Sequence, residues 1–212
     1  MTIKDIDSEL SKLRSCVVEL QCEYLLPYIG GGLGTPSNRQ ILDIRAFCVL
    51  SHAAFENYAE ELSMALMIES VHQFEYHKKI SLSLLTLIHF HADSKSIDKI
   101  SQRQYDYIKE ISNNAKRRFS EHVNNNHGVN KKYLDSLFIP LGIDITTDSL
   151  LLGSLKTLAD NRGDSAHKNP KRTSTIPDPE NIGKIADDVM KIMGELSKSV
   201  KNINFYPWKQ NI

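Results

Sequence analysis

Cysteine is scarce in this sequence, and its placement argues against the two structures that cysteines most often build. The 212 residues contain three cysteines, an odd number, and no two of them form a Cys-x-x-Cys pair. This pattern speaks against a disulfide framework and against a zinc cage of thiolates. We therefore interpret Cys16, Cys22 and Cys48 as small apolar residues buried in helices.

Long hydrophobic runs are also missing. No stretch approaches the roughly 20 apolar residues that are needed to cross a bilayer. The first residues, 1–7, show no basic segment followed by an apolar one, as a signal peptide would. These absences predict a cytoplasmic protein without a membrane partner.

The chain has no excess of one charge, because 26 lysines and arginines balance 26 aspartates and glutamates. Residues 1–100 carry 9 basic and 13 acidic side chains, whereas residues 101–212 carry 17 and 13. The basic surplus of the second half is weak support for a nucleic-acid partner. A content of 41% hydrophobic and 25% charged residues is typical of a folded globular protein, and the length suits a single domain over residues 1–212.

Apolar side chains at helical spacing are abundant. Residues 5–26 place apolar residues at steps of three or four, the period of one helix face. Residues 39–69 are apolar nearly all round, which predicts a long central helix. Asp178 followed by Pro179 predicts the start of a last helix, with aspartate as its cap. Shorter helices are predicted at residues 78–91, 99–123, 130–139 and 148–161.

The remaining segments are predicted to connect these helices. Residues 29–38 form a connector rich in glycine and proline, residues 168–178 a polar loop, and residues 204–212 a packed tail. The glycines of the connector lack the following Lys-Ser/Thr of a phosphate-binding loop, and the sequence contains no Gly-x-Ser-x-Gly or dinucleotide fingerprint. No segment alternates convincingly with a period of two, so we predict an all-α domain, a helical bundle around one long helix.

The sharpest local motif is Arg162-Gly163-Asp164-Ser165-Ala166-His167. An imidazole that titrates near neutral pH moves protons, and an arginine stabilises negative charge on a phosphoryl group, so the pair suits phosphodiester cleavage. Residues five apart on an unbroken helix point about 140° away from each other. We therefore expect Gly163 to end the helix and Asp164 or Ser165 to cap a new turn that redirects His167. The alternative is a solvated loop with a histidine that caps a helix.

A second group of polar residues lies on the long central helix. Arg45, His52 and Glu56 are spaced so that all three fall within about 20° of one line along its surface. An unpaired buried charge is costly, so this line needs partners. It forms either an internal network that fixes packing or a support for Arg162 and His167. The spacing of His52 and Glu56 alone is a poor metal signature, and we predict no metal site.

At these residues the sequence resembles the HEPN superfamily, and within it the RiboL-PSP-HEPN group. The resemblance is carried by IRAFCVLSHAAFENY at residues 44–58 and by LADNRGDSAH at residues 158–167, and it spans roughly residues 5–203. It implies a HEPN-like helical bundle. Many such domains are metal-independent endoribonucleases that act as toxins or as effectors of antiphage and stress responses, so the resemblance implies this activity and no cofactor.

The resemblance also implies roles for particular residues. Arg162 and His167 match the family's R-x4–6-H motif and are the candidate catalytic residues, although Gly163 stands where the family usually has a polar residue. Glu56 and Arg45 match the long-helix pattern of the group and are candidate supporting residues. Asp164 and His52 are added to them from their positions in the motif and on the helix, and the basic charge of Lys168, Lys171 and Arg172 makes these three residues candidates for binding RNA.

The implied mechanism is attack of the ribose 2′-OH on the adjacent phosphate, which leaves a 2′,3′-cyclic phosphate. In this family two motifs usually face each other across a dimer, so a homodimer with a composite site is implied, and we place its apolar contact near Leu152 and Leu155. An antitoxin or a defence-system protein is a further expected partner. The alternatives are an inactive HEPN module that binds RNA or a protein, and an unrelated helical scaffold.

Overall fold

The computed structural model describes residues 1–30, 36–92, 104–125, 127–167 and 176–208, and for Gln104, Ala166 and His167 it describes the backbone alone. Seven α-helices dominate this part of the chain. They are α1 (Ile6–Tyr24), α2 (Asn38–His77), α3 (Leu82–His91), α4 (Gln104–Asn125), α5 (Lys131–Phe138), α6 (Ser149–His167) and α7 (Pro179–Lys201). The predicted all-α fold is confirmed.

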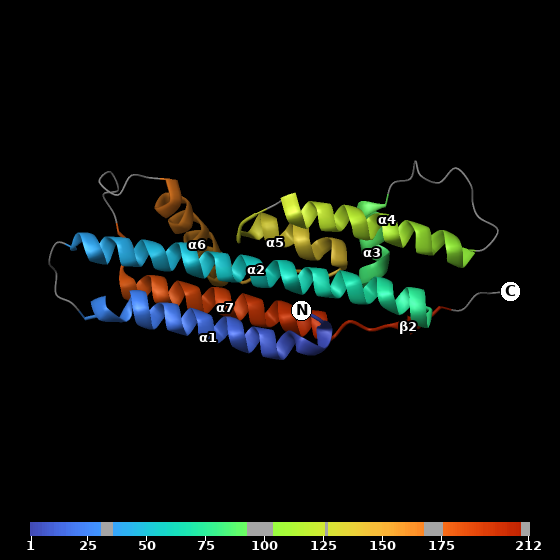
Figure 1. The fold of residues 1–212 in the computed structure, drawn as a ribbon, viewed down its shortest axis with the longest axis horizontal. Helices are drawn as coiled ribbons and strands as arrows, with labels where there is room; N and C mark the ends of the chain where they lie inside the picture. Colours follow the sequence, from blue (N-terminus) through green and yellow to red (C-terminus); the bar gives the residue numbers. More distant parts are fainter. Residues whose placement is uncertain (31–35, 93–103, 126, 168–175, 209–212) are drawn as a thin grey trace.

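The helices are arranged around α2, which runs along the whole length of the molecule (Figure 1). Helices α1 and α7 follow it on one side, α1 antiparallel and α7 parallel to it. Helices α3, α4, α5 and α6 cover the other side, with α6 near the beginning of α2 and α3 near its end. Every layer therefore packs on the same central helix.

Helix α2 is 40 residues long, about 60 Å at 1.5 Å per residue. Ser37 caps its start, because its hydroxyl accepts a hydrogen bond from the backbone N–H of Gln40. The buried phenylalanines of α2, Phe47, Phe55 and Phe74, lie in the core. The helix was predicted to end at residue 69 but continues to His77. Lys78 stops it by adopting a left-handed conformation, with φ of 51°.

Helices α1 and α7 agree with the sequence prediction. Asp178 caps α7 by accepting a hydrogen bond from the backbone N–H of Asn181, and Pro179 is the first helical residue. A buried hydrogen bond between the hydroxyls of Tyr58 and Ser197, at 2.7 Å, joins α2 to α7. Buried polar groups need such partners, so this contact fixes how the two helices align.

Three further details differ from the prediction. Helix α6 does not end near Asn161 but continues to His167. The segment before α3 is not helical, because strand β1 (Lys79–Ile80) pairs there with strand β2 (Tyr206–Pro207) of the tail in antiparallel register. Of the three cysteines only Cys48 is buried, since Cys16 and Cys22 are exposed.

Of the predicted packed tail, residues 209–212 lie outside the described residues, and Trp208 contacts the core and stands edge-on to Phe74. Short 3-10 turns at Ile3–Asp5, Leu26–Tyr28 and Ile139–Leu141 complete the described elements. Within the described ranges, no helix is both long enough and apolar enough to span a membrane.

Candidate active site

Arg162 lies on the side of α6 that faces the core. Leu155 and Leu158 are fully buried, and Arg162 follows Leu158 by four residues, one turn along the same face. The residue is half-buried, and α6 packs there against α2. Helix packing therefore holds the cation of the motif close to the line of polar residues on α2.

Gly163 does not interrupt the helix, so the predicted stop at this residue is wrong. It has no positive φ, and a Cβ built on it would meet no atom within 4 Å. Glycine costs about 1 kcal/mol inside a helix relative to alanine, which the buried leucines of α6 outweigh. Positions 162 and 167 consequently lie about 140° apart around one continuous helix.

Part of the predicted site lies outside the described residues. This holds for the side chain of His167 and for Lys168, Lys171 and Arg172. The backbone of His167 forms the end of α6. The position of His167 relative to Arg162 is therefore known only from the places of the two residues along α6.

His52 is the most deeply buried of the predicted supporting residues, with 3% of its surface exposed. Its Nε2 accepts a hydrogen bond of 3.0 Å from the backbone N–H of Val129, in the segment that leads into α5. An Nε2 that accepts is unprotonated, so the ring proton of the neutral imidazole is on Nδ1. That Nδ1 lies 3.5 Å from Oε2 of Glu56, which fixes both the tautomer and the ring orientation.

Burial, and to a smaller extent the positive charge of Arg162, together lower the pKa of His52 from 6.5 to about 4. Desolvation disfavours the charged imidazolium, and a nearby cation adds repulsion. His52 is therefore neutral at physiological pH. The influence of Arg162 on this ring links α6 to the polar line on α2.

Glu56, which was expected to support Arg162 and His167, has other partners. Its Oε1 accepts a hydrogen bond of 2.6 Å from the backbone N–H of Gly128 and lies 3.6 Å from Nδ1 of His127. Among the described residues, it forms no ion pair with Arg162. The supporting contact that we expected between α2 and the motif thus reaches the loop before α5 instead.

The other two supporting candidates are less central. Arg45 is half-buried on α2 and Asp164 is exposed on α6, and neither is without interaction partners. Asp164 is an internal helical residue rather than the cap of a new turn. The predicted line of Arg45, His52 and Glu56 does exist on α2, and His52 and Glu56 connect it to the loop before α5.

Two residues of this neighbourhood were missed in the sequence. Glu60 accepts a hydrogen bond from the hydroxyl of Tyr133, and burial and the carboxylate together raise the pKa of that tyrosine. His127 lies over Glu56 and Glu60, with its Nδ1 3.9 Å from Oε1 of Glu60. Glu60 lies one helical turn after Glu56, so it could have been predicted by following the same face of the long helix for one more turn. The position of His127 depends on a contact over more than 60 residues of sequence, and no local signal reveals it.

With this geometry in place, comparison with known protein families is decisive. A family model described as RiboL-PSP-HEPN matches residues 21–202. The chain belongs to the RiboL-PSP-HEPN family. A search of curated proteins and a search of solved structures each found no match. HEPN domains are helical and are often ribonucleases, so the family supports a function related to RNA.

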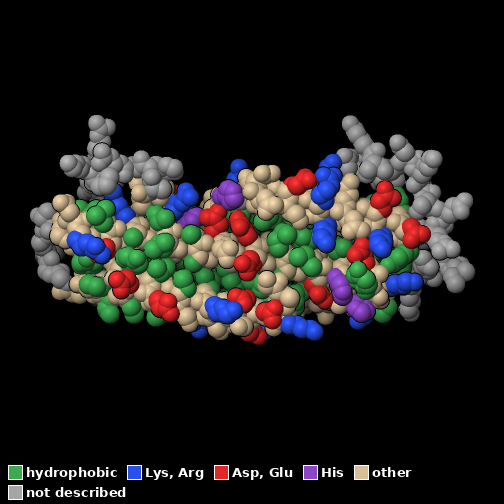
Figure 2. All heavy atoms as spheres, in the orientation of Figure 1, with side chains coloured by type: hydrophobic (Ala, Val, Ile, Leu, Met, Phe, Trp, Pro, Cys, Tyr) green, Lys and Arg blue, Asp and Glu red, His purple; other side chains and the backbone are tan. Residues whose placement is uncertain are grey.

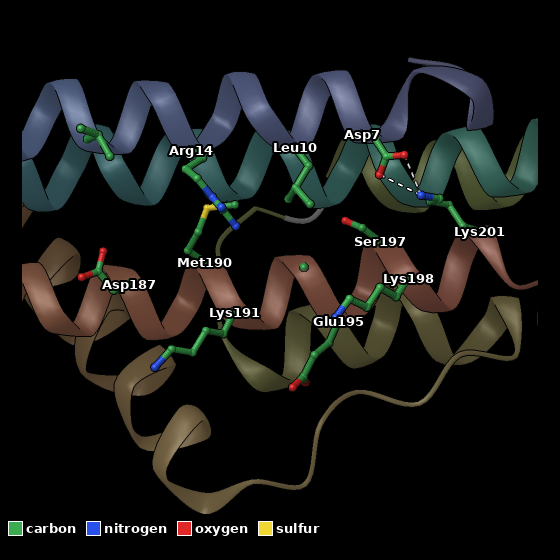
Figure 3. A pocket seen from close by; sticks show the side chains of 12 residues that line it. Asp7, Leu10, Arg14, Asp187, Met190, Lys191, Glu195, Ser197, Lys198 and Lys201 are labelled. Carbon is green, nitrogen blue, oxygen red and sulfur yellow. Dashed lines mark hydrogen bonds and ion pairs between the residues drawn. The ribbon is translucent and has the colours of Figure 1, made fainter.

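The HEPN domain also has a groove of about 680 Å³ between α1 and α7 (Figure 3). Its floor includes Leu10 and Met190, and basic and acidic side chains alternate along its walls. Lys201 is paired with Asp7 there at 2.7 Å. An RNA backbone needs concentrated positive charge, so this groove is a poor RNA site, and no residue of α6 lines it.

Proposed function

We propose that this HEPN domain is a metal-independent endoribonuclease whose catalytic residues are Arg162 and His167. The observation that carries the proposal is the family match over residues 21–202 combined with an Arg-x4-His motif in a helix that packs on the core. Arg162 is half-buried, and this supports the role because an arginine held by its helix binds a phosphate with little loss of freedom.

The proposed reaction is transesterification. A base removes the proton of the ribose 2′-OH, the 2′ oxygen forms a bond to phosphorus, and the bond from phosphorus to the 5′ oxygen breaks. An acid then supplies the proton that the 5′ oxygen requires. The products are a 2′,3′-cyclic phosphate and a 5′-OH. His167 handles proton transfer, and the guanidinium of Arg162 stabilises the negative charge of the pentacoordinate phosphorane.

We propose that the active unit is a homodimer in which two motifs face each other. Because α6 is unbroken, positions 162 and 167 of one chain are unfavourably placed for one phosphate. A partner's motif removes this difficulty, and two imidazoles divide the roles of base and acid. Leu155 is fully buried, so it is not available for the contact that we expected there, but Leu42, Leu50 and Leu150 expose apolar surface near α6 and the start of α2.

The biological role that fits this activity is that of a cytoplasmic toxin, or of an effector in antiphage or stress defence. Unrestrained cleavage of RNA harms the cell that makes the enzyme, so an antitoxin or a defence-system protein is the expected partner. Lys168, Lys171 and Arg172 are proposed to contact the RNA backbone, because they follow the catalytic motif directly and phosphate contacts supply most of such affinity.

The test is RNA cleavage in EDTA, with wild type compared with His167→Ala and Arg162→Lys. Total RNA and tRNA serve as substrates, and cyclic phosphate and 5′-OH ends are identified on the products. We expect wild type to cleave, His167→Ala to lose activity, and Arg162→Lys to lose most of it, because lysine lacks the planar two-donor geometry. The matched control is His89→Ala, an exposed histidine on α3 that should leave cleavage unchanged.

A second candidate is an inactive HEPN module that binds RNA or a protein. It is favoured by the uninterrupted helix at Gly163, which does not bring positions 162 and 167 of one chain together. RNA binding by wild type without any cleavage, at all protein concentrations, would support this second candidate and contradict the first.

A further inference from the structure

Glu56, Glu60 and His127 bring three potential metal ligands together on one side of α2. One carboxylate oxygen from each glutamate and one ring nitrogen of His127 all lie within 4.8 Å of one another. Figure 2 shows acidic and histidine side chains side by side near the middle of the viewed face, over α2. The glutamates are one helical turn apart, and the loop before α5 carries the histidine across them.

The distances suit metal coordination better than hydrogen bonding. Nδ1 of His127 is 3.6 Å from Oε1 of Glu56 and 3.9 Å from Oε1 of Glu60, and both are longer than a hydrogen bond. Two ligands of a tetrahedral ion with bonds of about 2.1 Å lie about 3.4 Å apart. The three ligand atoms lie within 4.8 Å of one another, so binding an ion requires them to move closer, and the exposed side chain of His127 is free to rotate towards the glutamates.

The charge of this site also favours a cation. The two glutamate side chains are mostly buried, at 15% and 25% exposure, and lie beside each other. In the part of the chain that the structure describes, neither forms an ion pair with lysine or arginine. Their close donors are neutral, namely the N–H of Gly128 and the hydroxyl of Tyr133. Two adjacent carboxylates without a permanent counter-charge repel each other, and a divalent ion would neutralise both.

The same neutral donors would orient the ligands. Each hydrogen bond leaves lone pairs of its carboxylate available and fixes the direction of the group, as is common for carboxylates that bind metal. His52 lies next to the second oxygen of Glu56 and restrains it further. The two carboxylates are therefore oriented by the loop before α5 and by α5 itself before any ion arrives.

We propose that Glu56, Glu60 and His127 bind one divalent transition-metal ion of the zinc type, with water completing the coordination. The mixture of one imidazole and two carboxylates matches Zn²⁺, whereas Mg²⁺ and Ca²⁺ prefer oxygen ligands alone. The ion ties the loop at Gly128 and Val129 to α2. It has no step in the RNA cleavage proposed above, and the inference does not depend on that activity.

The test measures Zn²⁺ binding to the full chain after treatment with EDTA and removal of the chelator. Isothermal titration calorimetry and thermal unfolding are compared for wild type, Glu60→Gln and His127→Ala. The matched controls are Glu61→Gln, which removes the same charge from the neighbouring exposed position, and His89→Ala. Glutamine at position 60 still accepts the hydrogen bond of Tyr133, and the exposed His127 contributes little to folding, so metal-free unfolding temperatures should remain close to that of wild type.

We expect wild type and both controls to bind one equivalent of Zn²⁺ and to unfold at higher temperature with the ion present. Glu60→Gln and His127→Ala should each weaken binding by at least about tenfold, since losing a ligand costs no less than losing a residue that orients one. The proposal is overturned if wild type binds no stoichiometric Zn²⁺, or if these two variants bind it as tightly as wild type does.

Discussion

The imidazole of His52 accepts a hydrogen bond from the backbone N–H of Val129, at 3.0 Å, in the interior of the protein. Protonation of the ring would replace this acceptor by a second donor, and a buried charge would appear beside Arg162. The contact that joins α2 to the loop before α5 therefore depends on a neutral histidine.

This dependence predicts a loss of stability in mild acid. The pKa of His52 is about 4 in the folded protein and 6.5 in the unfolded chain, so the unfolded state binds the proton more readily between these values. The stabilisation is complete above pH 6.5 and decreases as the pH falls towards 4. Its full size is at most about 3 kcal/mol. The measurement is chemical denaturation in EDTA across pH 4 to 7.

The control for this measurement is His52→Gln, whose side-chain oxygen accepts the same hydrogen bond but does not titrate. Other acidic groups contribute equally to both proteins, so the difference between the two free energies of unfolding isolates His52. A difference that stays constant over the pH range would show that His52 is not held neutral by its surroundings.

A second prediction concerns the electrostatic link between Arg162 and His52. Replacing Arg162 with glutamine removes a repulsive cation, so the pKa of His52 should rise, while burial still keeps it below 6.5. NMR titration of the imidazole measures this directly and requires no catalytic activity. Arg14→Gln, which removes an exposed arginine from α1, should leave the titration unchanged. An equal effect of both substitutions would contradict the proximity of α6 to His52.

The third prediction tests the continuity of α6. Gly163→Ala should stabilise the protein by about 0.5 to 1 kcal/mol, because alanine favours the helix and its Cβ meets no neighbour. Thermal or denaturant unfolding measures the change. Gly142→Ala is the opposite case, since φ is +71° there and a Cβ would lie 3.1 Å from Cγ of Leu82. Destabilisation by both substitutions would mean that Gly163 is needed for a bend.

The fourth prediction concerns assembly. If two motifs share one site, His167→Ala subunits added to wild type should reduce activity more than simple dilution does, because mixed dimers lack one imidazole. Sedimentation establishes the oligomeric state under the same conditions. A monomer with full specific activity at low concentration would refute the composite site and leave the ribonuclease assignment intact.

The sequence was sufficient for the elements with local signals. The cap at Asp178 and the apolar period of residues 5–26 predicted α7 and α1 correctly. The end of α2 was predicted too early, because the apolar face continues beyond residue 69 with Val71 and Phe74. The helix ends at Lys78, and lysine is not a residue type that usually ends a helix in a left-handed conformation. Gly163 was wrongly predicted to end α6, because glycine disfavours a helix only weakly. The packing of the buried leucines before it keeps the helix continuous.

The candidate site could also be predicted only in part from the sequence. The polar line on α2 followed from helical spacing, and the family followed from the motifs around Glu56 and Arg162. The partners of these polar residues could not be predicted from the sequence. Gly128 and Val129 come close to α2 only in the folded protein, and they bind it through their backbone N–H groups. Because nearly every residue has a peptide N–H, the residue types of a sequence do not show which of these groups donates a hydrogen bond.

That same use of backbone groups has an evolutionary consequence. Every residue except proline carries a peptide N–H, so the two donors that Glu56 and His52 bind at positions 128 and 129 survive most substitutions there. Gly128 has φ of +130°, which favours glycine, and Val129 is fully buried, which favours an apolar residue. Homologous chains should therefore exclude proline from positions 128 and 129 wherever the histidine and the glutamate of α2 are kept, whatever other side chains stand at these two positions.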